Sequence, residues 1–259
     1  MAMLDVQNLS ISFGGLKAVS RFDLTVEQGE IRGLIGPNGS GKTTLFNLIT
    51  GFYPPLEGRV HFQDEDITKL KPHQIAAKGI ARTFQNVQIF SGMSVAENLQ
   101  VGHHMSLKTG LLGAAFATGR ITGQENRSLQ KAEDLLRMIG MQELSARPAG
   151  SLPFGQQRKV EVLRALAMEP KLLLLDEPTS GLSVSEKDEM ADFMKWLRNE
   201  LRITILLVEH DVRLVAQVAD YITAMDFGQK ITEGTPEKVL SDPKVLEAYI
   251  GTEKPFGSK

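Results

Sequence analysis

Residues 36–43 of the chain read Gly36-Pro37-Asn38-Gly39-Ser40-Gly41-Lys42-Thr43. They follow an apolar run at 31–35 and precede a segment in which apolar residues recur at helical spacing. The pattern G-x-x-x-x-G-K-[ST] between a strand and a helix predicts a phosphate-binding loop, because its glycines let the main chain curl around a phosphate at a helix N-terminus. We therefore expect Lys42 to reach the β- and γ-phosphates of a nucleotide and the Thr43 hydroxyl to hold Mg²⁺.

Two acidic residues, Asp176 and Glu177, directly follow the apolar run 172–175. An unpaired carboxylate at the end of a buried strand is unfavourable, and a metal ion with a water supplies the missing partners. We expect Asp176 to bind Mg²⁺ through water and Glu177 to polarise the water that attacks the γ-phosphate. The alternative is a pair of ordinary surface acids at a strand end, which the phosphate loop earlier in the chain disfavours.

Composition sets limits on the class of protein. The 259 residues carry 29 basic and 31 acidic side chains, a net charge of −2, so no global charge favours nucleic acid. The absence of cysteine excludes disulfides, thiolate metal sites and a catalytic thiol. The sequence has no apolar run of about 18 residues and begins without the pattern of a signal peptide, so we expect neither a membrane span nor export.

The order of apolar patterns predicts an α/β fold. Uninterrupted apolar strands at 172–175 and 203–208, separated by a helical pattern, are typical of a buried parallel sheet. The middle of the chain is mainly helical and opens with a capping box formed by Ser94 and Glu97. We expect a nucleotide-binding core from residues 1–93 and 169–259 and an inserted helical subdomain from residues 94–168.

Taken together, these motifs resemble those of ABC transporter nucleotide-binding subunits over essentially the whole chain. Gln85, in the sequence RTFQ, resembles the glutamine that touches Mg²⁺ beside the membrane subunit. His210, after the next strand, resembles the histidine that senses the γ-phosphate, and Phe13 occupies the place of the aromatic that stacks on adenine. The resemblance implies a P-loop NTPase core with a parallel sheet, an antiparallel β subdomain and a helical subdomain.

The resemblance also implies a site for ATP and Mg²⁺. Lys42, Glu177 and His210 are expected to be catalytic, and Thr43, Gln85 and Asp176 to serve the metal. The residues expected to contact the nucleotide are Phe13, Gly36, Asn38, Gly39, Ser40, Gly41, Lys42, Thr43, Thr44, Gln85, Gly155 and Gln156.

Two segments depart from the family pattern. The signature segment, normally similar to LSGGQ, reads LPFGQ at 152–156, and Pro153 has neither a hydroxyl nor an N–H with which to bind a phosphate. Ser183 stands where the family usually has aspartate. Both changes suggest that the chain works with a different ATPase chain in an asymmetric pair.

The stretch 82–92, the insertion 110–123 and the ending after Gly234 resemble ATPases of branched-chain and other hydrophobic amino-acid importers, and of subunits for urea and related amides. This implies permease subunits and a second ATPase chain as partners, a substrate-binding protein indirectly, no nucleic acid, and a place on the cytoplasmic face of the membrane. Two alternatives stay open: a lipid or lipopolysaccharide transport ATPase, and an ABC ATPase acting on nucleic acid or ribosomes.

Two further features have an ordinary structural interpretation. The insertion 110–123 is expected to be a surface loop rather than a membrane-docking segment, because its apolar run is too short to anchor anything. His103 and His104 are expected to be solvated at a helix end, since no third metal ligand lies at suitable spacing.

Overall fold

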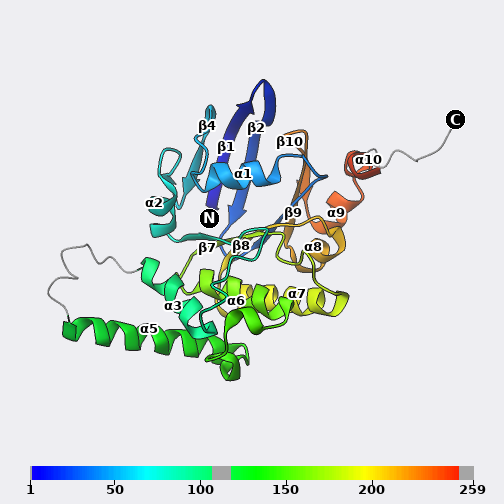
Figure 1. Cartoon of the computed structure of the whole chain (residues 1–259). Helices are drawn as coiled ribbons and strands as arrows, with labels where there is room; N and C mark the ends of the chain where they lie inside the picture. The colour runs from blue at the N-terminus through cyan, green and yellow to red at the C-terminus, as the bar shows by residue number, and fades with distance from the viewer. Residues whose placement is uncertain (1, 107–117, 251–259) are drawn as a thin grey trace. The chain divides into compact units, whose positions relative to one another are not determined.

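The structure is a computed structural model that describes residues 2–106 and 118–250. These residues fall into two compact units, one drawn from Met1–Ile80 and Leu172–Lys259 and the other from Ala81–Lys171. Each unit is described by itself below. Figure 1 shows the chain with most of its helices and strands labelled.

The first unit contains a four-stranded antiparallel sheet of order β2-β1-β4-β5. Its strands are β1 (Ala2–Phe13), β2 (Leu16–Glu27), β4 (Glu57–Phe62) and β5 (Glu65–Asp66). β1 and β2 are joined by Gly14 and Gly15, both at positive φ, which a two-residue hairpin requires.

A second sheet has the order β10-β9-β3-β8-β7-β6. Its strands are β3 (Ile31–Ile35), β6 (Ile80–Arg82), β7 (Leu172–Asp176), β8 (Thr204–Val208), β9 (Tyr221–Asp226) and β10 (Gln229–Gly234). β3 is parallel to β8 and β9, and β7 is parallel to β8. Every residue of β3, β7 and β8 is buried, which explains the apolar runs 172–175 and 205–208 and confirms the predicted parallel sheet.

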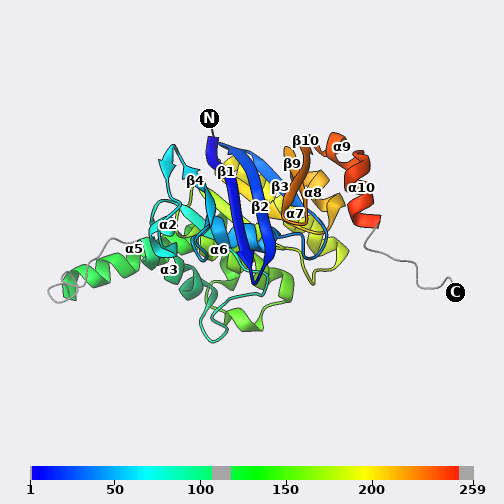
Figure 2. The same ribbon diagram turned by 90° about the horizontal axis from the view of Figure 1, so that it is seen from above.

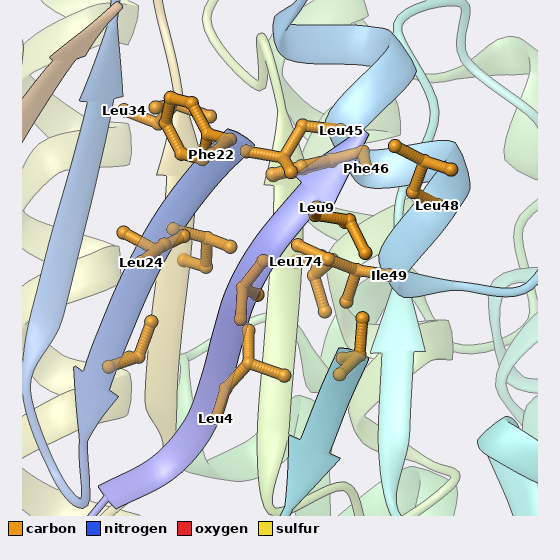
Figure 3. Close-up of a cluster of buried hydrophobic side chains, with 14 of the residues drawn as sticks. Leu4, Leu9, Phe22, Leu24, Leu34, Leu45, Phe46, Leu48, Ile49 and Leu174 are labelled. Carbon is orange, nitrogen blue, oxygen red and sulfur yellow. The ribbon is translucent and has the colours of Figure 1, made fainter. Parts of the chain in front are cut away.

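Helix α1 (Lys42–Ile49) supplies one side of the main core. Phe46 and Ile49 on α1 are fully buried and belong to the same apolar cluster as Leu9 of β1, Phe22 of β2 and Leu174 of β7. Figure 3 shows these side chains pointing toward one another between the helix and the strands. Burial of such side chains stabilises the fold by about 1.5–3 kcal/mol each, so the core fixes α1, and the loop before it, to both sheets.

The remaining helices of the first unit alternate with strands along the chain or come after the last strand. They are α2 (Pro72–Ala77), α7 (Val184–Glu200), α8 (Val212–Val218), α9 (Pro236–Leu240) and α10 (Pro243–Ile250). Pro236 and Pro243 open α9 and α10, where the missing N–H of proline has no helical partner to lose. α9 lies beside β9 and β10, and α10 lies beside β10 and α9 (Figure 2).

The second unit is mainly helical. It contains α3 (Val95–Ser106), α5 (Thr118–Met138), η1 (Gln142–Leu144), η2 (Ala149–Ser151) and α6 (Phe154–Leu166). The predicted capping box is confirmed, because the Ser94 N–H donates to Glu97 Oε2 at 2.7 Å and the Glu97 N–H donates to Ser94 Oγ at 3.2 Å. A Cβ on Gly102 would lie 2.1 Å from the Arg164 carbonyl oxygen, so α3 and α6 pack at close range.

Three expectations from the sequence need comment. His103 is buried with 8 % exposure, so its predicted solvation is wrong: it lies on the packed face of α3. Helix α5 begins at Thr118, so the end of the expected loop at 110–123 is helical. The part of that segment before residue 118 lies outside the described residues, as does the tail after 250. Within 2–106 and 118–250, no helix combines the length and apolar character that crossing a membrane requires.

Candidate functional site

The segment 36–41 connects β3 to α1 as a tight loop. Gly41 is the N-cap of α1 with φ 106°, and its carbonyl accepts the Leu45 N–H at 2.9 Å. Gly39 has φ 81°, and a Cβ there would meet no heavy atom within 4 Å. The loop therefore combines left-handed main-chain geometry with open space at its tip, and it ends at a helix N-terminus, where an anion is stabilised.

Two other segments of the first unit, one at Ala18 and one at Met225, contact this loop at close range. A Cβ on Gly36 would lie 2.2 Å from the Met225 carbonyl oxygen, and one on Gly41 would lie 2.4 Å from the Ala18 carbonyl oxygen. The Gly228 N–H also donates to the Ser40 carbonyl at 2.8 Å. We call β2 near Ala18 together with the β9–β10 turn the loop brace, because the two segments hold the loop main chain in place.

Lys42 directs its ammonium back into the loop. Its Nζ donates to the carbonyl oxygens of Gly36 at 2.7 Å and Pro37 at 3.0 Å. Burial lowers the pKa of the Lys42 ammonium below its ordinary value, and the carboxylates of Glu177 and Asp176 act in the opposite direction. The loop thus holds a cation among oxygen atoms beside two acids.

Those two acids stand at the carboxyl end of β7. Asp176 is the last strand residue and is 2 % exposed. Glu177 has φ 49°, an unusual value for glutamate, and its N–H donates to the Val208 carbonyl at the end of β8 at 2.9 Å. Because β3, β8 and β7 are adjacent and parallel, the phosphate loop and both acids lie along one edge of the sheet.

His210 follows β8 on the same edge. Its Nδ1 lies 3.6 Å from Glu177 Oε2, and its side chain is 52 % exposed whereas that of Glu177 is 14 % exposed. The structure therefore brings Glu177 and His210 together, with His210 on the solvent side.

Sequence reasoning missed Glu209, which is completely buried. Its Oε1 accepts the N–H of Thr179 at 2.9 Å and the Thr179 hydroxyl at 2.6 Å. These bonds join the segment after β7 to the segment after β8 and so support the positions of Glu177 and His210. The signal that could have found Glu209 is an acid directly after a fully apolar strand, the same signal that selected Asp176.

Phe13 lies at the end of β1 with 43 % exposure. Its ring makes an edge contact with Tyr53, with centroids 5.2 Å apart and an interplanar angle of 69°. Tyr53 is also partly exposed, at 40 %, so the pair presents aromatic surface to solvent, which a stacking base requires. Tyr53 was not singled out by the sequence.

Gln85, Gly155 and Gln156 belong to the second unit, so their geometry is separate from that of Lys42 and the acids. Gln85 is exposed, and its carbonyl accepts a hydrogen bond from Arg158 at 2.5 Å. Pro153 is the N-cap residue of α6, Gly155 is buried and Gln156 is half-buried in its first turn.

Ser183 has a clear local role in the first unit. It is the N-cap of α7, and with Glu186 it forms a capping box in which each side chain bonds the other residue's N–H. Serine and aspartate are both good N-cap residues, so the departure from the family's aspartate preserves the helix start.

The residues present fit a nucleotide and a divalent cation. The loop offers open space at Gly39, a helix N-terminus and a buried ammonium for phosphates, while Thr43 is exposed at the start of α1 and Asp176 supplies a carboxylate nearby. A hard cation bound between phosphates and such oxygen atoms is the usual arrangement in phosphate-loop enzymes. Fold and site define a P-loop nucleotide hydrolase.

Comparison with known proteins is consistent with this class. The family model "ABC transporter" matches residues 19–180, and the model "Branched-chain amino acid ATP-binding cassette transporter" matches residues 229–255. The chain belongs to the ABC transporter family, as an ATP-binding subunit with ATPase activity.

Curated relatives cover almost the whole chain. It is 41 % identical over 249 residues to the high-affinity branched-chain amino acid transport ATP-binding proteins BraF of Pseudomonas aeruginosa and LivG of Escherichia coli, covering 96 % of this chain and 98 % of each relative. A probable LivG of Archaeoglobus fulgidus is 38 % identical over 255 residues, 98 % of this chain and 97 % of the relative.

Solved structures agree with the fold. A nucleotide-free ATP-binding cassette from an ABC transporter is 38 % identical with a TM-score of 0.83, covering 97 % of this chain and 100 % of that one. The ADP conformation of such a cassette is also 38 % identical, with a TM-score of 0.84 and coverage of 97 % and 99 %. The predicted fold class and the predicted binding of a nucleotide are confirmed by these similarities.

Proposed function

We propose that this chain hydrolyses MgATP to drive uptake of branched-chain or other hydrophobic amino acids, or related amides such as urea, through partner permeases. The observation that carries the proposal is the 41 % identity, over nearly full length, to two proteins named for branched-chain amino acid transport. The match of residues 229–255 to a family model of the same name supports it at the carboxyl end of the chain.

In the proposed site, Lys42 contacts the β- and γ-phosphates, and Thr43, Asp176 and Gln85 serve Mg²⁺. Glu177 activates the attacking water and His210 contacts the γ-phosphate; their separation of 3.6 Å allows both to meet one phosphate and its water. Phe13 stacks on the adenine with its exposed surface. The main-chain groups of residues 36–44 bind the phosphates, as the left-handed glycines and the start of α1 favour.

We further propose that residues 94–168 act as the helical subdomain and that residues 1–93 with 169–259 act as the nucleotide-binding core. In a dimer of cassettes, the segment at Gly155 and Gln156 completes the site of the opposite chain. Because Pro153 offers no N–H and Phe154 replaces a glycine, the second cassette is a different chain with a complete signature segment. The pair lies against permease subunits on the cytoplasmic face, and a substrate-binding protein delivers the cargo.

Uptake of labelled leucine by cells that lack this chain tests the transported class. The wild-type chain restores uptake, and Lys42→Ala does not, because its site loses the buried ammonium. Lys17→Ala, which removes an exposed lysine of the same unit, is the matched control and restores uptake. Normal leucine uptake without the chain, with loss of urea or lipid transport instead, would reassign the cargo.

Purification tests the partners. Glu177→Gln retains bound ATP because the attacking water loses its base, so the tagged variant, extracted from membranes with ATP, keeps its assembly. Mass spectrometry then identifies the co-purifying chains, and we expect two multispanning permeases and a second cassette. A single cassette species contradicts the asymmetric pair, and normal ATP turnover by Glu177→Gln removes Glu177 from its role.

A further inference from the structure

The second unit holds a buried ion pair on one face of α6. Arg158 and Glu161 are one helical turn apart, with exposures of 3 % and 2 % and an N–O distance of 3.2 Å. Burying two charges is unfavourable unless further hydrogen bonds satisfy them. The partners that supply those bonds therefore indicate what the pair does.

Those partners are main-chain groups of the segment 84–88, which lies in no helix or strand. The guanidinium of Arg158 donates to the carbonyl oxygens of Phe84 at 3.2 Å and Gln85 at 2.5 Å. On the other side, Glu161 Oε1 accepts the N–H of Gln88 at 3.2 Å. One ion pair thus holds three main-chain groups of the loop that carries Gln85.

The same guanidinium also contacts the signature segment. Its carbon lies 5.5 Å from the centroid of the Phe154 ring, within the range of a cation–π contact. Gln157, the residue before Arg158 on α6, donates its side-chain N–H to the Leu152 carbonyl oxygen at 2.8 Å and so fixes the start of the helix. Arg158 therefore contacts the signature segment and the Gln85 loop at once.

We propose that Arg158 and Glu161 are positioning residues for hydrolysis, which fix the main chain from which Gln85 projects and link it to the signature segment through Phe154. The proposal rests on the proposed role of Gln85. Neither member of the pair touches nucleotide; each acts through the Gln85 loop. A planar guanidinium suits this task because its fork donates to two carbonyls while its face meets an aromatic ring.

Arg158→Met removes the fork and the charge in the full chain and so releases the loop. We expect faster amide hydrogen exchange in the peptide covering 84–90 and about a tenfold lower kcat, since small displacements of a positioned group are sufficient for such losses. The Kd for nucleotide changes less than kcat, because the phosphate loop with Lys42 is untouched. Arg158→Lys keeps the charge without the fork and gives an intermediate kcat. In both variants exchange is faster at 84–90 and unchanged in the strands of the first unit, a local pattern that general destabilisation does not produce.

The matched control is Arg137→Met. Arg137 forms an exposed i,i+3 ion pair with Asp134 on α5, so its loss leaves kcat and exchange at 84–90 unchanged. Unchanged exchange at 84–90 in Arg158→Met overturns the proposal that the pair holds the loop. Faster exchange with normal kcat overturns its importance for hydrolysis.

A double-mutant cycle with Gln85→Ala completes the test. If Arg158 acts through the Gln85 side chain, Arg158→Met lowers kcat in the wild type but not in the Gln85→Ala background. If the loss of kcat in the double variant equals the product of the losses in the two single variants, the residues act independently and the proposal is overturned. Normal hydrolysis by Gln85→Ala alone overturns the proposed role of Gln85, whereas a large loss in Gln85→Ala with full activity in Arg158→Met overturns only the positioning role of the pair.

Discussion

Gly228→Ala tests whether the loop brace controls the phosphate loop. Gly228 has φ 76° in the β9–β10 turn, and an added Cβ would lie 2.6 Å from the Ala18 carbonyl oxygen, where ordinary contacts begin at 3.4 Å. The turn must therefore move by several tenths of an ångström. That movement weakens two hydrogen bonds, from the Gly228 N–H to Ser40 and from the Ser20 N–H to Gly228.

The structure allows the size of the effect to be worked out. A left-handed conformation costs an L-residue about 1–2 kcal/mol, and each weakened hydrogen bond costs about 1 kcal/mol. We expect the free energy of unfolding to fall by about 3 kcal/mol. Because Ser40 shifts with the turn, the Kd for nucleotide should also rise about tenfold, which corresponds to about 1.4 kcal/mol.

Gly29→Ala is the matched control. Gly29 has φ 77°, almost the same value, but an added Cβ there meets no heavy atom within 4 Å. Urea denaturation should show a loss of about 1 kcal/mol from the backbone conformation alone, with no change in nucleotide Kd by fluorescence titration. Equal losses of stability in the two variants, with equal Kd values, would refute the reasoning, because contact with the brace would then contribute nothing.

Three further predictions concern the edge of the sheet around the site. Thr179→Val leaves the buried Glu209 carboxylate without its hydroxyl donor and should lower the free energy of unfolding by about 1–3 kcal/mol, whereas Thr179→Ser should stay near wild type in the same urea titration. Ser183→Ala should lower stability by about 1 kcal/mol through loss of the helix cap, and Ser183→Asp should not; equal losses in thermal denaturation would contradict the capping role. The hydrogen bond from Lys187 lowers the pKa of Asp211 below its ordinary value of 3.8, so the stability it contributes is present above pH 3.8 and is lost as the pH falls through the folded-state pKa. Lys187→Met should therefore be less stable than wild type at pH 7, with the difference shrinking below pH 3.8; a difference independent of pH would contradict this.

The sequence was sufficient to predict features whose residues lie close together along the chain. The phosphate loop and the two acids each lie within eight consecutive residues, and the apolar runs before them fix the strands that carry them. Ser183 could have been found in the same way, since Ser183 and Glu186 have the spacing of a capping box. Helix α8 (Val212–Val218), which the sequence analysis did not predict, also carries a local signal, because Asp211 caps it by accepting the Leu214 N–H.

Other features depend on contacts between distant segments. Thr179 and Glu209 are 30 positions apart, and nothing in either segment alone shows that a hydroxyl meets a buried carboxylate. The close approach of Gly228 to Ala18 is likewise a property of packed main chains. His103 is buried because it lies on the face of α3 that packs. Helical periodicity does not show which face that is when polar and apolar residues are mixed along the helix.

The place of β3 in its sheet has a consequence for synthesis of the chain. β3 is made early, but its two neighbours, β8 and β9, come from residues 204–226, and the turn that bonds Ser40 follows β9. While the ribosome is still translating the middle of the chain, the strand before the phosphate loop has no partner on either side. The phosphate loop of the nascent polypeptide thus gains the contacts that hold it in the folded chain only after residue 228 has left the ribosome.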